Sequence, residues 1–346
     1  MGNKSIITRG MTRDGSARVL VINSKELVNG MLEVHKTAPT STAALGRLVT
    51  AASMIGTMLP ENGDTVTLGF NADGEIGKML AVADYFGNVK SFIANPNADP
   101  KRRPDGKLNV GEAVGNGVFY MIRDIGGKEP QSGTIEIVSG EIAEDIATYF
   151  AKSEQVPTVL SLGVLVGVDG RCRASGGVLI QLLPFPDDKT VDLIERNAGE
   201  LYNISSMFDR GMTNEEIIEV AMRDIPFDYF DTIEVEYRCD CSRDRMCKKI
   251  KGLGKSEIID MLNAQEKPSV HDADRRLFCN LRPMRNIFLS DAFELPGIFI
   301  RRLSSRMAVM IFSAPLLSVS FYSAAPTITA RRRSFIYIAF PQPLRT

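Results

Sequence analysis

Residues 40–59, TSTAALGRLVTAASMIGTML, predict one long, buried helix. Its apolar residues recur at helical spacing, at Ala44, Leu48, Ala51, Ile55 and Leu59. Small residues such as Gly46 and Gly56 lie among them and allow neighbouring elements to pack closely. The run Pro60-Glu61-Asn62-Gly63 then ends the helix.

Short segments of strand character lie on both sides of this helix. Glycine, asparagine, aspartate and proline separate them, and such regular spacing is typical of a largely antiparallel sheet. The predicted strands span residues 19–23, 65–70, 78–83, 89–93, 117–123 and 133–138, and a hairpin through Asp169-Gly170 joins 158–168 to 176–183. Further helices are predicted over residues 24–34 and, with Ser139 as the N-cap, up to residue 150. Together these segments predict an α+β fold.

A boundary follows the hairpin, at Pro184-Phe185-Pro186. Beyond it, residues 191–210 and 214–222 predict two amphipathic helices, each with an apolar face. Because these helices separate the sheet-rich region from a cysteine-rich segment, they are either a plain connector or a movable cover.

The cysteine-rich segment covers residues 233–247, IEVEYRCDCSRDRMC, and begins with a strand-like alternation of Ile233, Val235 and Tyr237. In an extended chain the C-x-C pair Cys239 and Cys241 presents both sulfurs to one face. Two such thiolates are half of a tetrahedral metal site, which needs further ligands from elsewhere in the chain. Neighbouring arginines favour the thiolate form and make the sulfurs easier to oxidise. Two ordinary reduced cysteines at the end of a strand are the alternative interpretation.

Composition points to a reducing compartment and to no bulk electrostatic partner. The 346-residue chain has a net charge of −1, which favours neither nucleic acid nor a membrane surface. Residues 1–20 lack the apolar core of a signal peptide, so we expect a cytoplasmic protein. Five cysteines, an odd number gathered late in the chain, fit metal binding or redox sensing better than a disulfide framework.

The composition changes abruptly after a predicted helix over residues 255–264. From residue 268 onward there is no lysine, and eleven arginines carry the positive charge. We interpret this segment as out of frame with the rest of the chain, with a basic tail as the alternative. Residues 307–324 are apolar but diluted by serines and broken by Pro315, so they do not predict a membrane anchor.

Several segments, in order, give the chain a resemblance to a known family. They are MLEVHKTAPTSTAALGRLVTAASMIGTML, GNGVFYMIRD, IATYFAKSEQVPT, GGVLIQLLP and VEYRCDCSRDRM. Over residues 1–264 the chain resembles the redox-regulated holdase chaperones of the thirty-three-kilodalton heat-shock protein family. The resemblance implies an ATP-independent protein, not an enzyme, that binds unfolding clients under oxidative stress. It further implies a reduced state with one zinc ion on four cysteines, release of zinc as disulfides form, and a homodimer when activated.

The resemblance also assigns the site residues. Cys239 and Cys241 match the family's first ligand pair, and Cys279 matches the last ligand of a C-x-x-C pair. Arg276 stands where the partner of Cys279 is expected. A fourth ligand would then come from Cys247 or His271. Two residues that fall outside this set are Cys172, which we expect to be structural, and His35, to which we assign no catalytic role.

The implied organisation has four parts. Residues 1–184 form an α+β chaperone domain, residues 185–232 a helical linker, residues 233–281 an incomplete zinc-binding redox switch, and residues 282–346 an atypical tail.

Two other functions remain open at this point. One is a chaperone without a working zinc switch, since the second ligand pair is incomplete. The other is a thiol-disulfide exchange enzyme, with Cys239 as nucleophile and Cys241 as resolving thiol, although no C-x-x-C in a thioredoxin-like context supports it.

Overall fold

The structure is a computed structural model that describes residues 4–126 and 129–238. Within this part of the chain, ten strands form two five-stranded antiparallel sheets. The first sheet has the order β10-β1-β2-β9-β8 and the second β5-β4-β3-β6-β7. The first sheet comprises β1 Ser5–Thr12, β2 Ala17–Asn23, β8 Thr158–Val166, β9 Cys172–Leu182 and β10 Phe227–Val235. The second comprises β3 Thr65–Ala72, β4 Lys78–Asp84, β5 Val89–Ile93, β6 Gly117–Asp124 and β7 Gln131–Glu136.

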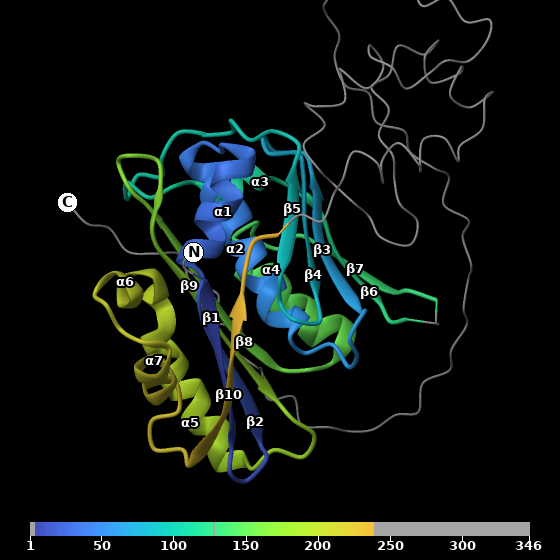
Figure 1. Cartoon of the computed structure of the whole chain (residues 1–346), viewed down its shortest axis with the longest axis vertical. Helices are drawn as coiled ribbons and strands as arrows, with labels where there is room; N and C mark the ends of the chain where they lie inside the picture. The colour runs from blue at the N-terminus through green and yellow to red at the C-terminus, as the bar shows by residue number, and fades with distance from the viewer. Residues whose placement is uncertain (1–3, 127–128, 239–346) are drawn as a thin grey trace, which may run out of the picture. The chain divides into compact units, whose positions relative to one another are not determined.

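Helix α2, Pro39–Gly56, lies between the two sheets (Figure 1). Every residue of α2 after Pro39 is buried, as predicted from the sequence. It packs against β3, β4 and β5 of the second sheet and against β2, β8 and β9 of the first. Pro39 is well placed in the first turn, where its missing N–H costs no helical hydrogen bond. Helices α1, Lys25–His35, and α3, Val110–Val114, pack beside α2.

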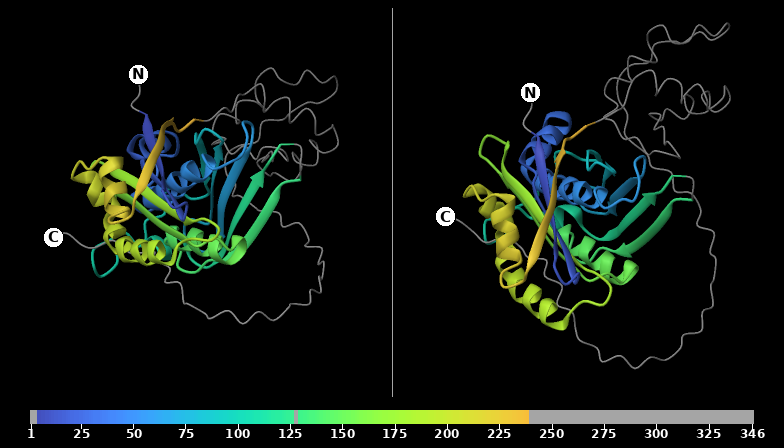
Figure 2. Two further views of the ribbon diagram at one scale, coloured as in Figure 1. Left: turned by 90° about the horizontal axis from the view of Figure 1, so that it is seen from below. Right: turned by 60° about the horizontal axis from the view of Figure 1, so that its bottom comes forward.

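The outer face of the first sheet carries a second apolar cluster. Here α5 Asp188–Ala198, a 3-10 helix Gly199–Asn203, α6 Ile204–Asp209 and α7 Asn214–Ala221 follow one another along the sheet (Figures 1 and 2). Strand β2 is buried on both faces, because Leu20 and Ile22 join the central core while Val19 and Val21 join this outer cluster. The helices contribute Ile194, Leu201, Ile204, Ile217 and Ile218.

The structure confirms the α+β class and corrects several element predictions. Strand β1 and helix α3 were not predicted, and β10 begins at Phe227, before the alternation that the sequence shows. The predicted helix over residues 191–210 is instead α5, a 3-10 helix and α6, because the chain tightens at Gly199.

Ser139 is not a helix cap. Helix α4, Ala143–Tyr149, begins four residues later and continues as a π-helical segment, Phe150–Glu154. The carboxylate of Asp145, in the first turn of α4, reaches back and accepts hydrogen bonds from the backbone N–H groups of Val138, Ser139 and Ile142, at 2.7, 3.1 and 3.2 Å.

Other predictions concern segments that lie outside the described residues, among them the helix over 255–264 and the segment 307–324. The four-part organisation stays a prediction. Within residues 4–126 and 129–238, no helix is both long and apolar enough to cross a membrane.

We predict opposite effects for two glycine substitutions. A Cβ at Gly56 would lie 2.6 Å from the carbonyl oxygen of Asp84 and 2.8 Å from the Cβ of Ala83, inside the packed core. Gly56→Ala is therefore expected to lower the free energy of unfolding by about 1–3 kcal/mol. Gly199→Ala is the matched control, because a Cβ there meets nothing within 4 Å and the φ of −59° suits alanine. We expect Gly199→Ala to stabilise the protein by about 0.4–1 kcal/mol. Urea unfolding curves in which Gly56→Ala is the more stable of the two variants would contradict the close packing around Gly56.

Candidate functional site

The last described residues tie the first sheet to the second, immediately before Cys239. Strand β10 pairs with β1 along its whole length, and the chain then reaches the edge of β5. There the Val89 N–H donates to the carbonyl of Glu236 at 3.1 Å, and the Arg238 N–H donates to the carbonyl of Val89 at 2.9 Å. Arg238 is therefore held in place one residue before Cys239. Figure 1 shows the end of β10 approaching β5.

A polar cluster, made of the buried His35 and Ser91 and the partly buried Tyr237, anchors this segment. The Tyr237 hydroxyl oxygen lies 3.0 Å from His35 Nε2 and 3.1 Å from Ser91 Oγ, and it accepts from the Ser91 N–H at 3.2 Å. His35 Nε2 is also 3.1 Å from the Ser91 carbonyl oxygen. Because a carbonyl oxygen only accepts, this contact assigns the proton to Nε2. Three segments far apart in the sequence thus meet at one hydroxyl.

The His35 imidazole is kept neutral by its surroundings. Only 7 % of the residue is exposed, and burial lowers its pKa below 6.5, opposed by the hydrogen bond to the Ser91 backbone. Its ring also meets the Tyr237 ring edge to face, with the centroids 6.3 Å apart. We assigned no catalytic role to this histidine from the sequence, and its contacts show a structural one.

Two glycines allow the close approach of this segment to the rest of the fold. A Cβ at Gly30 of α1 would lie 2.9 Å from the Cβ of Tyr237. Gly87 adopts a φ of +79°, and a Cβ there would lie 2.9 Å from Val235 Cγ1. Larger residues at either position would push the end of β10 away from β5.

Exposed ion pairs also join β10 to β1. Lys4 binds Glu234 at 2.9 Å, Arg9 binds Asp231 at 2.5 Å and Arg13 binds Asp228 at 3.0 Å. Pairs of this kind are screened by water and salt, so they help to set the register and contribute little to stability. Within the described part of the chain, we infer that the polar cluster at Tyr237 holds the end of β10 more strongly than these exposed ion pairs do.

The cysteines and the histidine that we assigned to metal binding lie outside the described residues. They are Cys239, Cys241, Cys247, His271 and Cys279, and Arg276 lies there too. Among residues 4–126 and 129–238, no group of three or more Cys, His, Asp or Glu side chains is placed to hold a metal ion.

Cys172 lies inside the described fold, at the start of β9. It is 2 % exposed and bears a free thiol, and burial raises the pKa of that thiol to about 12. A thiol that stays protonated and covered is a poor nucleophile, which agrees with the structural role expected from the sequence.

The sequence contained little indication of the polar cluster. Tyr237 belonged to the alternation before Cys239, and His35 lay in one of the stretches that carry the family resemblance. Nothing in the sequence joined them to Ser91, because the contacts span 56 residues from His35 to Ser91 and 146 from Ser91 to Tyr237.

Removal of one hydroxyl is expected to weaken the anchor. Tyr237→Phe leaves the buried Ser91 N–H without its partner and leaves Ser91 Oγ with His35 Nε2 alone, at 3.3 Å, which costs about 1–3 kcal/mol. The control is Tyr229→Phe, because Tyr229 is 45 % exposed and its hydroxyl makes one long contact, 3.4 Å, to the Glu215 carbonyl. Urea unfolding should show a loss for Tyr237→Phe and almost none for Tyr229→Phe. Equal losses would refute the anchor.

A pH dependence follows from the buried imidazole. The lowered pKa of His35 means that the folded state binds its proton less readily than the unfolded state does. The contribution of the neutral histidine to the free energy of unfolding is therefore complete above pH 6.5. It is lost as the pH falls through the lowered pKa. We expect His35→Gln to remove this part of the pH dependence of unfolding, while the contribution of carboxylates remains in both proteins. Parallel stability curves for the two proteins between pH 8 and pH 5, about 1.5 units either side of an ordinary histidine pKa, would contradict the assignment.

Comparison with known proteins agrees with this architecture. A 33 kDa chaperonin of Agathobacter rectalis is 39 % identical over 274 residues, covering 79 % of this chain and 94 % of the relative. A 33 kDa chaperonin of Clostridium acetobutylicum is 37 % identical over 302 residues, covering 86 % and 98 %.

A crystal structure of the 33 kDa chaperonin, heat shock protein 33 homolog, from Thermotoga maritima superimposes with a TM-score of 0.70 at 30 % identity. It covers 84 % of this chain and all of that one. The family model described as Hsp33 protein matches residues 5–280. The chain therefore belongs to the Hsp33 family of chaperones.

Proposed function

We propose that this protein is a redox-regulated, ATP-independent holdase that binds unfolding proteins, and not an enzyme. Membership of the family supports the chaperone function. The observation that carries the mechanism is the apolar outer face of the first sheet, which three helices cover. A holdase needs an apolar surface that it can hide and expose, because unfolding clients present apolar segments to water.

The covering helices are held mainly by apolar contacts. Their apolar side chains are buried against Val19, Val21, Val178 and Ile180 of the sheet. Most of their ion pairs, such as Arg196 with Asp224, join segments within the cover itself and are exposed. A change that lifts the cover would therefore expose both the helix faces and the sheet face.

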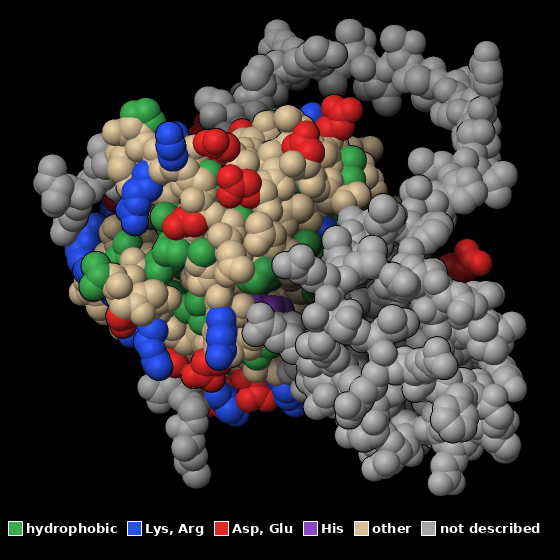
Figure 3. Space-filling model, turned by 90° about the horizontal axis from the view of Figure 1, so that it is seen from above, with side chains coloured by type: hydrophobic (Ala, Val, Ile, Leu, Met, Phe, Trp, Pro, Cys, Tyr) green, Lys and Arg blue, Asp and Glu red, His purple; other side chains and the backbone are tan. Residues whose placement is uncertain are grey.

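On the face that Figure 3 shows, charged side chains are interspersed with small groups of apolar ones. A surface of this kind offers a client only scattered apolar contacts. The outer cluster is different, because its apolar side chains are contiguous and become accessible only when the helices leave the sheet. We therefore assign client binding to that cluster.

The end of β10 provides a route from the cysteines to the cover. Helix α7 ends at Ala221 and β10 begins at Phe227, so the two share a short connection. Helix α7 is attached to β1 through the Asn214 amide, which donates to the Ile6 carbonyl at 2.9 Å. Release of the anchor at Tyr237 would leave β10 held by its ladder with β1 alone, and separation of that ladder would carry α7 away from the sheet.

The candidate thiols have chemistry that suits both zinc and oxidation. Cys239, Cys241 and Cys279 would supply three thiolates, and Cys247 or His271 would supply a fourth donor of a kind that zinc accepts. When bound, zinc would join these distant side chains into one folded unit. Hydrogen peroxide would convert two of the thiols into a disulfide with the formation of two water molecules. Sulfurs joined in a disulfide no longer act as thiolate ligands.

We further propose that the protein acts in the cytoplasm and forms a homodimer when activated. A reducing compartment would keep the thiols reduced until an oxidant appears. A dimer would enlarge the apolar surface that one client meets.

The test is a parallel measurement of zinc and client protection on the full chain. Wild type, Cys172→Ser and Cys239→Ser are purified under reducing conditions, and zinc is measured per chain. Light scattering then follows the aggregation of a chemically denatured client, before and after peroxide. We expect about one zinc per chain in wild type and in Cys172→Ser, released as protection appears. Cys239→Ser should not retain it.

Two results would contradict parts of the proposal. Protection without zinc and without peroxide would show a chaperone that has lost its switch. An absence of protection under both conditions would reject the holdase function for this chain.

A further inference from the structure

A basic cavity lies at the first turns of α2. It has a volume of about 180 Å³ and is lined by the start of α2, the loop over residues 102–108 and the end of β8. Four cationic side chains line it, Arg47, Arg102, Arg103 and Lys107. The proposed chaperone function uses none of them.

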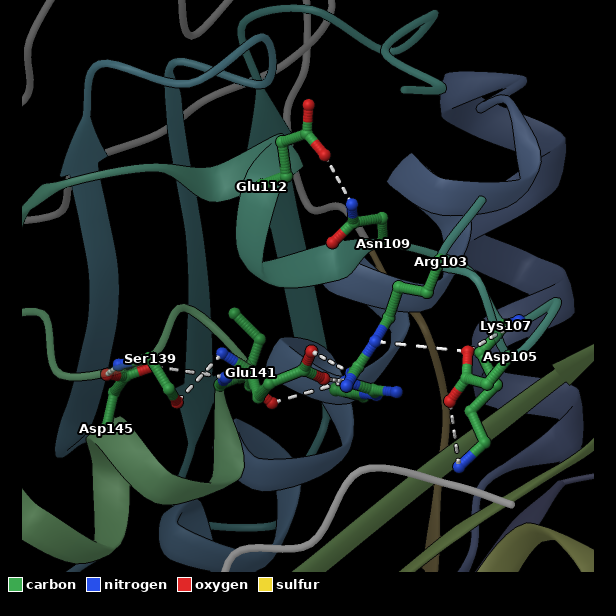
Figure 4. A network of polar contacts seen from close by, with 10 residues as sticks. Arg103, Asp105, Lys107, Asn109, Glu112, Ser139, Glu141 and Asp145 are labelled. Carbon is green, nitrogen blue, oxygen red and sulfur yellow. Dashed lines mark hydrogen bonds and ion pairs between the residues drawn. The ribbon is translucent and has the colours of Figure 1, made fainter. Parts of the chain in front are cut away.

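Two carboxylates contact three of these four cations, and Arg102 donates to the Gly106 carbonyl instead. Glu141 accepts from Arg47 Nη1 at 2.7 Å and from Arg103 Nη1 at 3.4 Å, so it is shared by two guanidinium groups (Figure 4). Asp105 is 4.0 Å from Arg103 and 3.8 Å from Lys107, which are long contacts for ion pairs. The cluster therefore keeps an excess of two positive charges at a concave surface.

Two of the cations, Arg47 and Lys107, are partly enclosed by the fold before any ligand arrives. Arg47 is 8 % exposed, and its Nε has no hydrogen-bond partner among the described residues. Lys107 lies 5.7 Å from the centroid of the Tyr202 ring. Burial lowers the pKa of Lys107, and Asp105 and Glu141 oppose this effect. The crowding of like charges from Arg103 and Arg47 lowers the pKa further. Such crowding costs free energy that an anion in the cavity would recover.

The shape of the cavity limits the kind of anion. Apolar walls from Pro39, Ala43, Leu108 and Val164 lie next to the charged groups. Guanidinium groups bind tetrahedral oxyanions through paired hydrogen bonds, and two excess charges match a dianion. We propose that this cavity binds a phosphate group, either as free phosphate or as the monoester of a small organic molecule whose body rests on the apolar walls.

The test uses two probes, inorganic phosphate and glycerol 3-phosphate, titrated calorimetrically into the reduced full-length protein at constant ionic strength. The variant Arg103→Gln/Lys107→Gln removes two of the cations and leaves the more buried Arg47 in place. Lys101→Gln is the matched control, because this exposed lysine precedes the cavity loop and does not line the cavity. Unchanged circular dichroism shows that each variant is folded.

We expect saturable binding by wild type and by Lys101→Gln, and a loss of affinity of about tenfold or more in the double variant. Tighter binding of glycerol 3-phosphate would assign the site to a monoester, and equal or tighter binding of inorganic phosphate would assign it to the free anion. The proposal is wrong if neither probe binds wild type, or if the folded double variant binds as well as Lys101→Gln does.

Discussion

Burial of α2 on all sides is the constraint from which the two-sheet arrangement follows. A helix with no face toward water needs apolar surface around its whole circumference, and two sheets supply it. The helix still contains hydroxyl groups, and these donate hydrogen bonds to carbonyl groups within the helix or in the chain packed against it. Ser53 donates to the Gly87 carbonyl at 2.6 Å, and Thr50 donates to the Gly46 carbonyl at 2.7 Å. The contact at Gly87 also holds the turn before β5, the strand that receives the end of β10.

The anchor at Tyr237 extends this arrangement to the chain that follows. Because β10 belongs to the first sheet and the next residues bind the second, a single segment bridges both. The chain leaves that bridge at Arg238, one residue before Cys239. A chemical change in the cysteine segment is therefore adjacent to contacts that hold β10, and β10 is close in sequence to the helices that cover the outer cluster. This proximity makes the proposed redox control physically reasonable.

The sequence predicted the parts of the fold that have a strong local pattern. Helix α2 and the β8–β9 hairpin were found because their spacing and turn residues are unambiguous. Strand β1 was missed because Thr8, Arg9 and Gly10 interrupt its apolar alternation, and its partners alone show that it is a strand. The polar cluster at Tyr237 could not be predicted, since it depends on three segments that only the tertiary fold brings together. The metal ligands stay predictions, because they lie outside the described residues.

The proposed redox control requires that the end of β10 is clamped to β5 in the reduced protein and released on oxidation. Amide hydrogen exchange at Val89 and Arg238 measures this most directly, because each of these N–H groups takes part in the bridge. We expect both amides to be protected from exchange in the reduced state and to lose this protection after peroxide. Amides in the centre of β3 and β4 should remain protected. Exchange at Val89 and Arg238 that is fast before oxidation, or that oxidation leaves unchanged, would contradict it.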